Sequence, residues 1–117
     1  MKDNFTISIL EIVGSPFCVA SGDGEKVHDR IAASMEKGHA VTISFMNVTS
    51  LTAAFLNAAI GQLYGTLKED QIRTKLKVKD MQPGDFALLK RVVDTAKEYF
   101  TDPERFKRAE RAAARDS

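Results

Sequence analysis

Three hydroxyl side chains gather at the junction of a predicted strand and a predicted helix. They are Thr49, Ser50 and Thr52, within the stretch SFMNVTSLTAAFLNAAIG over residues 44–61. A Ser or Thr at such a junction can cap the helix by accepting a hydrogen bond from its first amides. The same amides and the helix dipole can hold an anion or a phosphorylated side chain. One cap needs one hydroxyl, and we expect Thr49 or Ser50 to supply it. Two interpretations stay open, a cap alone or a cap within a recognition surface.

The other reactive side chains do not form a catalytic or metal-binding pattern. A metal site would require further ligands, such as a cysteine or a pair of carboxylates, at a suitable spacing from the histidines. His28 and His39 are too far in sequence from such residues. Cys18 stands among apolar residues and is typical of a small buried hydrophobe. The glycines of the turn over residues 21–24 are followed by Glu25, whereas a phosphate loop needs Lys and then Ser or Thr. We therefore expect no catalytic residue, no metal, no cofactor and no enzymatic activity.

Basic residues are arranged in two groups that could be mistaken for a nucleic-acid interface. The first alternates along a predicted strand and has no interleaved aromatic residue for base stacking: Arg73, Lys75, Lys77 and Lys79. The second lies in the C-terminal segment, where Glu104, Glu110 and Asp116 dilute it: Arg105, Lys107, Arg108, Arg111 and Arg115. The strand group is typical of a solvated edge that discourages aggregation. Nucleic acid is therefore a disfavoured partner.

The composition is that of one globular domain. The chain has 117 residues, of which 44% are hydrophobic and 28% charged, and this length can bury a substantial core. Seventeen basic and sixteen acidic residues give a net charge of +1, which favours neither nucleic acid nor a membrane surface. The single cysteine excludes a disulfide within the chain, and no segment resembles a signal peptide or a membrane span. We expect a cytoplasmic protein.

Hydrophobic periodicity predicts an α/β fold with a small mixed, mostly parallel sheet of about four strands and helices mainly on one face. The predicted strands are residues 5–13, 17–20 (paired back as a hairpin), 40–45 and 72–78. The predicted helices follow the turn Ser21–Gly24 and stop at Gly38, then cover residues 51–64 and 83–100. The last helix is expected to face inward with five residues: Phe86, Leu89, Val93, Ala96 and Phe100. Residues 1–102 would form the domain, and residues 103–117 a polar, helical or frayed tail.

The run HAVTISFMNVTSLTAAFLNAAIGQLYG, with the helix before it, resembles the bacterial STAS-like domains of unknown function. These are relatives of the STAS domains of anti-sigma-factor antagonists and sulfate transporters. The resemblance covers about residues 5–100 and implies a small sheet with helices packed on one side. It also implies a regulatory module of signal transduction, commonly acting with a histidine-kinase-like ATPase that serves as a serine kinase.

The resemblance also marks one position as a phosphorylation switch, and this chain departs from it. Antagonists carry an Asp-Ser-Ser-Gly motif at the start of the helix, and its second serine is phosphorylated. Aligned without gaps, that motif falls on residues 52–55, and the phosphorylated serine corresponds to Ala54, which has no hydroxyl. A phosphate would have to be placed on Thr49, Ser50 or Thr52 instead, and the place of Thr52 in the first turn of the helix favours that residue.

The sequence thus predicts a non-catalytic protein-interaction module that binds its partner through residues 47–57. Asn47 and Asn57 would supply polar contacts and Phe55 an apolar anchor, with Ser21 and Asp23 in a neighbouring turn. The partner would be a protein, with the ATPase implied by the resemblance, and self-association is also open. The alternative is a small-ligand or nucleotide-binding domain that uses the same helix N-terminal edge.

Overall fold

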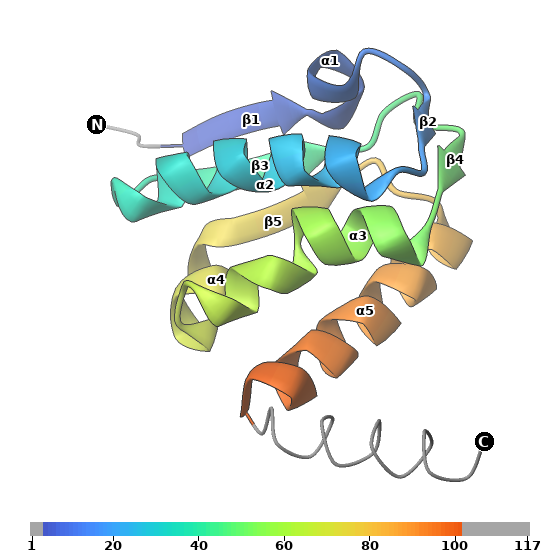
Figure 1. Cartoon of the computed structure of the whole chain (residues 1–117). Coiled ribbons are helices and arrows are strands. Elements are labelled where there is room, and N and C mark those ends of the chain that lie inside the picture. Colours follow the sequence, from blue (N-terminus) through green and yellow to red (C-terminus); the bar gives the residue numbers. More distant parts are fainter. Residues whose placement is uncertain (1–3, 102–117) are drawn as a thin grey trace, which may run out of the picture.

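The structure is a computed structural model that describes residues 4–101 (Figure 1). Its main sheet has three parallel strands, β1 (Asn4–Ser8), β3 (Ala40–Ser44) and β5 (Leu76–Lys79), in the order β1-β3-β5. A second sheet joins two short parallel strands, β2 (Phe17–Cys18) and β4 (Ser50–Leu51). The predicted α/β class with a largely parallel sheet is confirmed, although the strands are divided between two sheets.

Helices account for most of the remaining chain. They are α1 (Ile9–Val13), α2 (Ser21–Glu36), α3 (Ala53–Ala59), the 3₁₀ helix η1 (Gly61–Gly65), α4 (Glu69–Lys75) and α5 (Pro83–Thr101). The main strands follow one another across the sheet in chain order, so right-handed crossovers place their connecting helices on the same face. Figure 1 shows α2 and α3 side by side in front of that sheet. This agrees with the predicted one-sided arrangement.

The strand register separates a buried face from a polar face. Ile7, Ile43 and Val78 lie in one row across the main sheet and pack in the core or against it. The next row is polar and consists of Thr6, Thr42 and Lys77. Side chains alternate along a strand, so these two rows point to opposite faces of the sheet. The helices cover the apolar face, and the other face carries mainly hydroxyls and lysines. From the helix side, the core is filled by wholly buried residues: Val27, Ile31, Met35, Phe55, Leu56 and Leu63.

Gly24 allows α2 and α3 to approach each other closely. A Cβ atom at this position would lie 2.5 Å from the carbonyl oxygen of Phe55 and 2.8 Å from the Cβ of Ala58. No side chain larger than hydrogen fits there without movement of a helix backbone. The N-terminal turn of α2 is therefore held against α3, at Phe55 and the last turn of that helix. The other end of α2 is closed as predicted, since Gly38 follows it with a φ of 87°.

Residues 9–13 form a helix, and the prediction of a strand over 5–13 is wrong for this part. The Ser8 side chain caps α1 by accepting a hydrogen bond from the amide of Glu11, and Gly14 ends the helix in the left-handed conformation. The predicted hairpin is also wrong. β2 does not pair with β1 but lies parallel to β4, far along the chain.

Residues 69–75 also form a helix, so the predicted strand over 72–78 is wrong in its first half. Glu69 and Asp70 lie in the first turn of α4 and Arg73 and Lys75 in its last, where each sign of charge is favourable to the helix dipole. Only residues 76–79 join the sheet. The basic group is consequently divided between a helix and a strand, and it does not form one stripe.

The two remaining predicted helices are present with altered details. The helix predicted over 51–64 begins at Ala53 and changes into η1 after Ile60, with Gly61 at the change. α5 begins at Pro83, a residue suited to a first helical position, but its buried residues are Leu89, Val92 and Ala96. Phe86 is exposed, contrary to the prediction.

None of the helices in residues 4–101 is long and apolar enough to cross a membrane. The predicted tail over 103–117 lies outside the described residues.

Candidate functional site

The carboxyl ends of the three main strands meet at one end of the molecule. The segments that lie there are residues 16–20, 45–52 and 80–86, which we call the carboxyl edge. Ser44 links two of them, since its hydroxyl donates to Asp80 Oδ2 at 2.7 Å and accepts from the amide of Met46 at 3.3 Å. Asn47 and Asp80 have positive φ values of 66° and 61°, a conformation that asparagine and aspartate tolerate. These tight loops give the edge a defined shape.

Two of the three hydroxyls at the strand–helix junction hold the carboxyl edge together. Thr52 caps α3 by accepting from the amide of Phe55 at 3.2 Å, and its hydroxyl donates to the carbonyl of Val19 at 2.8 Å. The Thr49 hydroxyl donates to the carbonyl of Pro16 at 3.3 Å. The prediction that Thr49 or Ser50 caps the helix is therefore wrong, because Thr52 does so. Ser50 is partly exposed, and its hydroxyl makes no hydrogen bond within residues 4–101.

The other predicted contact residues are only partly brought together. Phe55 is wholly buried between α2 and α3 and cannot be an apolar anchor, which corrects that prediction. Asn47 is exposed in the loop after β3, whereas Asn57 is exposed on α3 and faces a groove shared with α5. Ser21 and Asp23 lie in the first turn of α2, beside α3, and Asp23 is 3.6 Å from the ammonium of Lys26.

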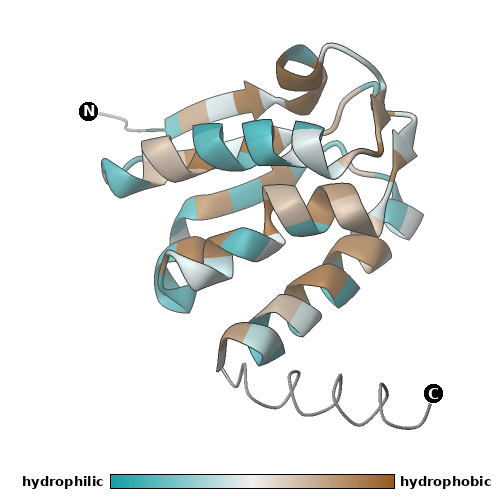
Figure 2. Cartoon of the chain, in the orientation of Figure 1, coloured by the Kyte–Doolittle hydropathy of each residue, from teal (hydrophilic) through white to brown (hydrophobic). Residues whose placement is uncertain are grey.

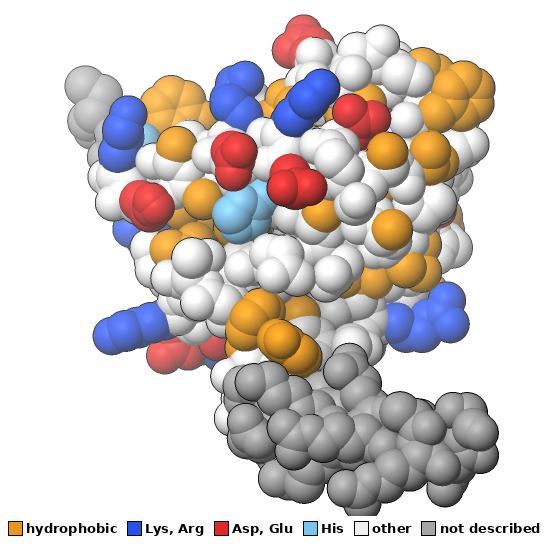
Figure 3. Space-filling model, viewed as in Figure 1, with side chains coloured by type: hydrophobic (Ala, Val, Ile, Leu, Met, Phe, Trp, Pro, Cys, Tyr) orange, Lys and Arg blue, Asp and Glu red, His pale blue; other side chains and the backbone are white. Residues whose placement is uncertain are grey.

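Sequence reasoning missed the exposed apolar side chains of the carboxyl edge. Phe17, Val19, Met46 and Phe86 are exposed to 58%, 45%, 57% and 54%, and each belongs to one of the three segments of the edge. Figure 3 shows hydrophobic side chains at the upper right, where Figure 1 places β2 and β4. Figure 2 shows that α1 and β2 at this end are strongly hydrophobic. The sequence carried one usable signal, because Cys18 is buried in a two-residue strand and its neighbour Phe17 must point the other way.

The remaining candidate side chains have local structural roles. Cys18 is wholly buried, and desolvation, with a smaller contribution from the Asp23 carboxylate, raises the pKa of its thiol. The thiol is therefore protonated at neutral pH. Among the basic residues, Arg73 pairs with Asp70 at 2.7 Å and Lys75 donates to the carbonyl of Gly38. No three His, Cys, Asp or Glu side chains in the described part of the chain are grouped as metal ligands.

Comparison with known proteins identifies a family. Residues 23–86 match the model of the STAS-like domain of unknown function (DUF4325). The match extends from the first turn of α2 to the first turn of α5 and covers more than half of the chain. It includes β3, β4, β5 and all three hydroxyls of the junction. No curated protein and no solved structure matches the chain. The extent of the family match, together with the parallel sheet and its helices, shows that this chain belongs to the STAS-like domains of unknown function.

Proposed function

We propose that this domain is a non-catalytic regulatory module that binds a protein partner through its carboxyl edge. The observation that carries the proposal is the grouping of Phe17, Val19, Met46 and Phe86 at this end of the molecule. Exposed apolar side chains that come from separate segments and share one end of a domain are typical of interaction surfaces. The other exposed large apolar residues of the described chain, Phe5 and Tyr99, lie at the opposite end of the strands and of α5.

The edge also has the properties of a preorganised contact surface. Thr49 and Thr52 fasten the segment around β4 to the segment around β2, and Ser44 fastens the loops after β3 and β5. A partner would meet a surface whose backbone is already ordered, which lowers the entropic cost of binding. Asn47 and Ser50, both accessible at least in part, offer polar contacts beside the apolar side chains. Buried Phe55 takes no part.

The resemblance to anti-sigma-factor antagonists suggests the class of partner. Those proteins act with histidine-kinase-like ATPases, and we propose a partner of that class. Ala54 occupies the position of the phosphorylated serine, and Thr52 uses its hydroxyl for two structural hydrogen bonds. The edge would therefore act as a constitutive docking surface, without a phosphate switch at either position.

A binding measurement with matched variants tests the proposal. The probe is a purified histidine-kinase-like ATPase, titrated calorimetrically with the wild type and with the double variant Phe17→Ser/Met46→Ser. Tyr99→Ser is the control, since it removes an exposed aromatic ring at the opposite end. We expect the double variant to lose binding by at least about tenfold and Tyr99→Ser to retain it. Equal affinity of the folded double variant and the wild type would refute the carboxyl edge as the docking surface.

A further inference from the structure

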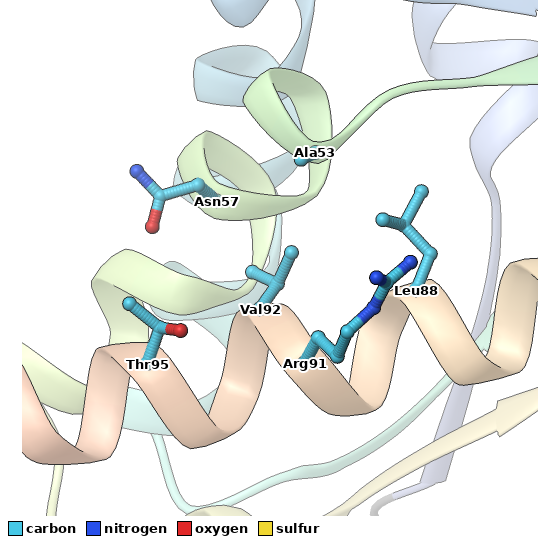
Figure 4. A pocket seen from close by; sticks show the side chains of 6 residues that line it. All are labelled: Ala53, Asn57, Leu88, Arg91, Val92 and Thr95. Atoms are coloured by element: carbon cyan, nitrogen blue, oxygen red, sulfur yellow. The ribbon is translucent and has the colours of Figure 1, made fainter.

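A groove lies between α3 and α5, next to the carboxyl edge, and none of the four exposed apolar side chains of that edge lines it. Its volume is about 390 Å³, within the range of small-molecule sites. At about 30 Å³ for each water-sized group, it has room for roughly a dozen non-hydrogen atoms. Six residues line it (Figure 4): Ala53, Asn57, Leu88, Arg91, Val92 and Thr95.

The groove combines an apolar floor with hydrogen-bonding groups at its two ends. Val92 is buried at the base, and Leu88 and Ala53 extend the apolar surface. Figure 4 shows the Arg91 side chain extending toward Leu88 at one end, with Asn57 and Thr95 at the other. Few polar groups around an apolar body are the usual composition of a site for an amphipathic small molecule.

Arg91 supplies a positive charge that the described residues do not neutralise. Its neighbour Asp94 pairs with Lys90 at 3.4 Å, and none of the ion pairs within residues 4–101 includes Arg91. Its guanidinium extends toward Leu88 in Figure 4, and a guanidinium can bind a carboxylate through two parallel hydrogen bonds. A single cation matches a monoanion better than a phosphate dianion.

Asn57 also contacts residues outside the groove. Its carbonyl oxygen accepts from Nε2 of Gln62 at 3.4 Å. Gly61 leaves room for this arrangement, since a Cβ there would lie 2.6 Å from the same oxygen. Figure 4 shows this oxygen turned toward Thr95 and the NH₂ group turned away from it, so the remaining lone pair of the Asn57 oxygen and the Thr95 hydroxyl are the polar groups at this end. This end of the groove therefore suits a hydroxyl group.

We propose that the α3–α5 groove binds a small organic carboxylate of about a dozen non-hydrogen atoms. Arg91 pairs with the carboxylate, Ala53, Leu88 and Val92 cover the apolar body, and Asn57 and Thr95 bind a polar group at the far end. The groove extends over about two turns of α5, which is short for a partner helix and sufficient for such a molecule. The inference goes beyond the proposed docking function and does not depend on it.

The test titrates the whole chain with three carboxylates, followed by NMR and by calorimetry. The probes are 3-(4-hydroxyphenyl)propanoate, indole-3-acetate and decanoate, each of about a dozen non-hydrogen atoms. We expect saturable binding of at least one acid with a polar far end, with amide shifts centred on Asn57, Arg91 and Thr95. Decanoate, which has no polar far end, should bind more weakly, and inorganic phosphate should not bind.

Matched ligands and variants then test whether Arg91 is the residue that recognises the carboxylate. The neutral 3-(4-hydroxyphenyl)propanamide should bind the wild type at least about tenfold more weakly than the acid. Arg91→Gln should remove this difference, while Lys90→Gln, on the same helix, should preserve it. Three outcomes would overturn the proposal: no saturable binding by any acid, equal loss in both variants, or groove shifts that follow protein concentration rather than acid. The last of these would assign the groove to a second copy of the chain.

Discussion

The close approach of α2 and α3 at Gly24 makes a quantitative prediction. In Gly24→Ala, the new methyl would lie 2.5 Å from the Phe55 carbonyl oxygen and 2.8 Å from the Ala58 Cβ, with the Ala59 amide nitrogen at 3.2 Å. Carbon atoms in contact prefer separations of about 3.5–4.0 Å, so one helix must move by roughly 1 Å. Two of these three neighbours are backbone atoms and cannot turn away. Overpacking of this kind costs about 1–3 kcal/mol of unfolding free energy.

Gly22→Ala is the matched control for this substitution. Gly22 is in the same turn of α2, and a Cβ there would meet no atom within 4 Å. Both variants gain the helix propensity of alanine, up to about 1 kcal/mol, so the difference between them isolates the clash. For a difference of about 2 kcal/mol, urea midpoints followed by circular dichroism should differ by roughly 1 M. If Gly24→Ala were as stable as Gly22→Ala, the argument that glycine is required between these helices would be refuted.

Further predictions concern the carboxyl edge and the buried thiol. Thr52→Ala should lower the unfolding free energy by about 1–2 kcal/mol through loss of the cap, and Thr52→Ser should recover most of it in urea unfolding. Ser44→Ala should cost about 1–2 kcal/mol, because Asp80 and the Met46 amide lose a partner. The exposed Thr6→Ala should stay within about 0.5 kcal/mol, and equal losses at both positions would contradict the role given to Ser44. The raised pKa of Cys18 means that the folded state keeps its proton where the unfolded thiol, with a pKa of about 8.5, has lost it. The unfolding free energy should therefore fall as pH rises above about 8.5, more steeply than in Cys18→Ala, and parallel pH profiles would contradict this assignment.

Local patterns predicted the elements whose residues have a single consistent periodicity. Val27, Ile31 and Met35 recur at intervals of four, which only a helix places on one face, and α2 was predicted with its end at Gly38. The strand prediction for residues 72–78 failed because the spacing of Ile72 and Leu76 satisfies both the period of two of a strand and the interval of four of a helix. The acidic first turn of α4 decides between these, and it lies before the alternating run.

The sequence predicted where the hydroxyl-rich junction lies in the fold, but not which side chains surround it. The hydroxyl-rich junction does lie at the carboxyl ends of the strands, as the strand–helix order required. The exposure of Phe17 and Phe86 depends on which segments pack beside them, and those contacts join residues that are distant in the chain. The pairing of β2 with β4, which brings Phe17 to the edge, has no signal in either two-residue strand. The same dependence on tertiary contacts explains why Phe55 was predicted as a surface anchor.

The two hydrogen bonds of the Thr52 hydroxyl have a kinetic consequence for any kinase that acts at the junction. A local opening that breaks the bonds to Val19 and Phe55 frees the acceptor oxygen for phosphoryl transfer. At about 1 kcal/mol each, this local opening would be populated roughly once in thirty molecules. Phosphorylation of Thr52 would then proceed about thirtyfold more slowly in the folded chain than in a peptide of the same sequence. The modified molecule could not close again in the same way, because α3 would have lost its cap and the β4 segment its tie to the Val19 carbonyl. The rate of modification, relative to that of the peptide, would therefore measure the population of molecules in which this end of the domain is open.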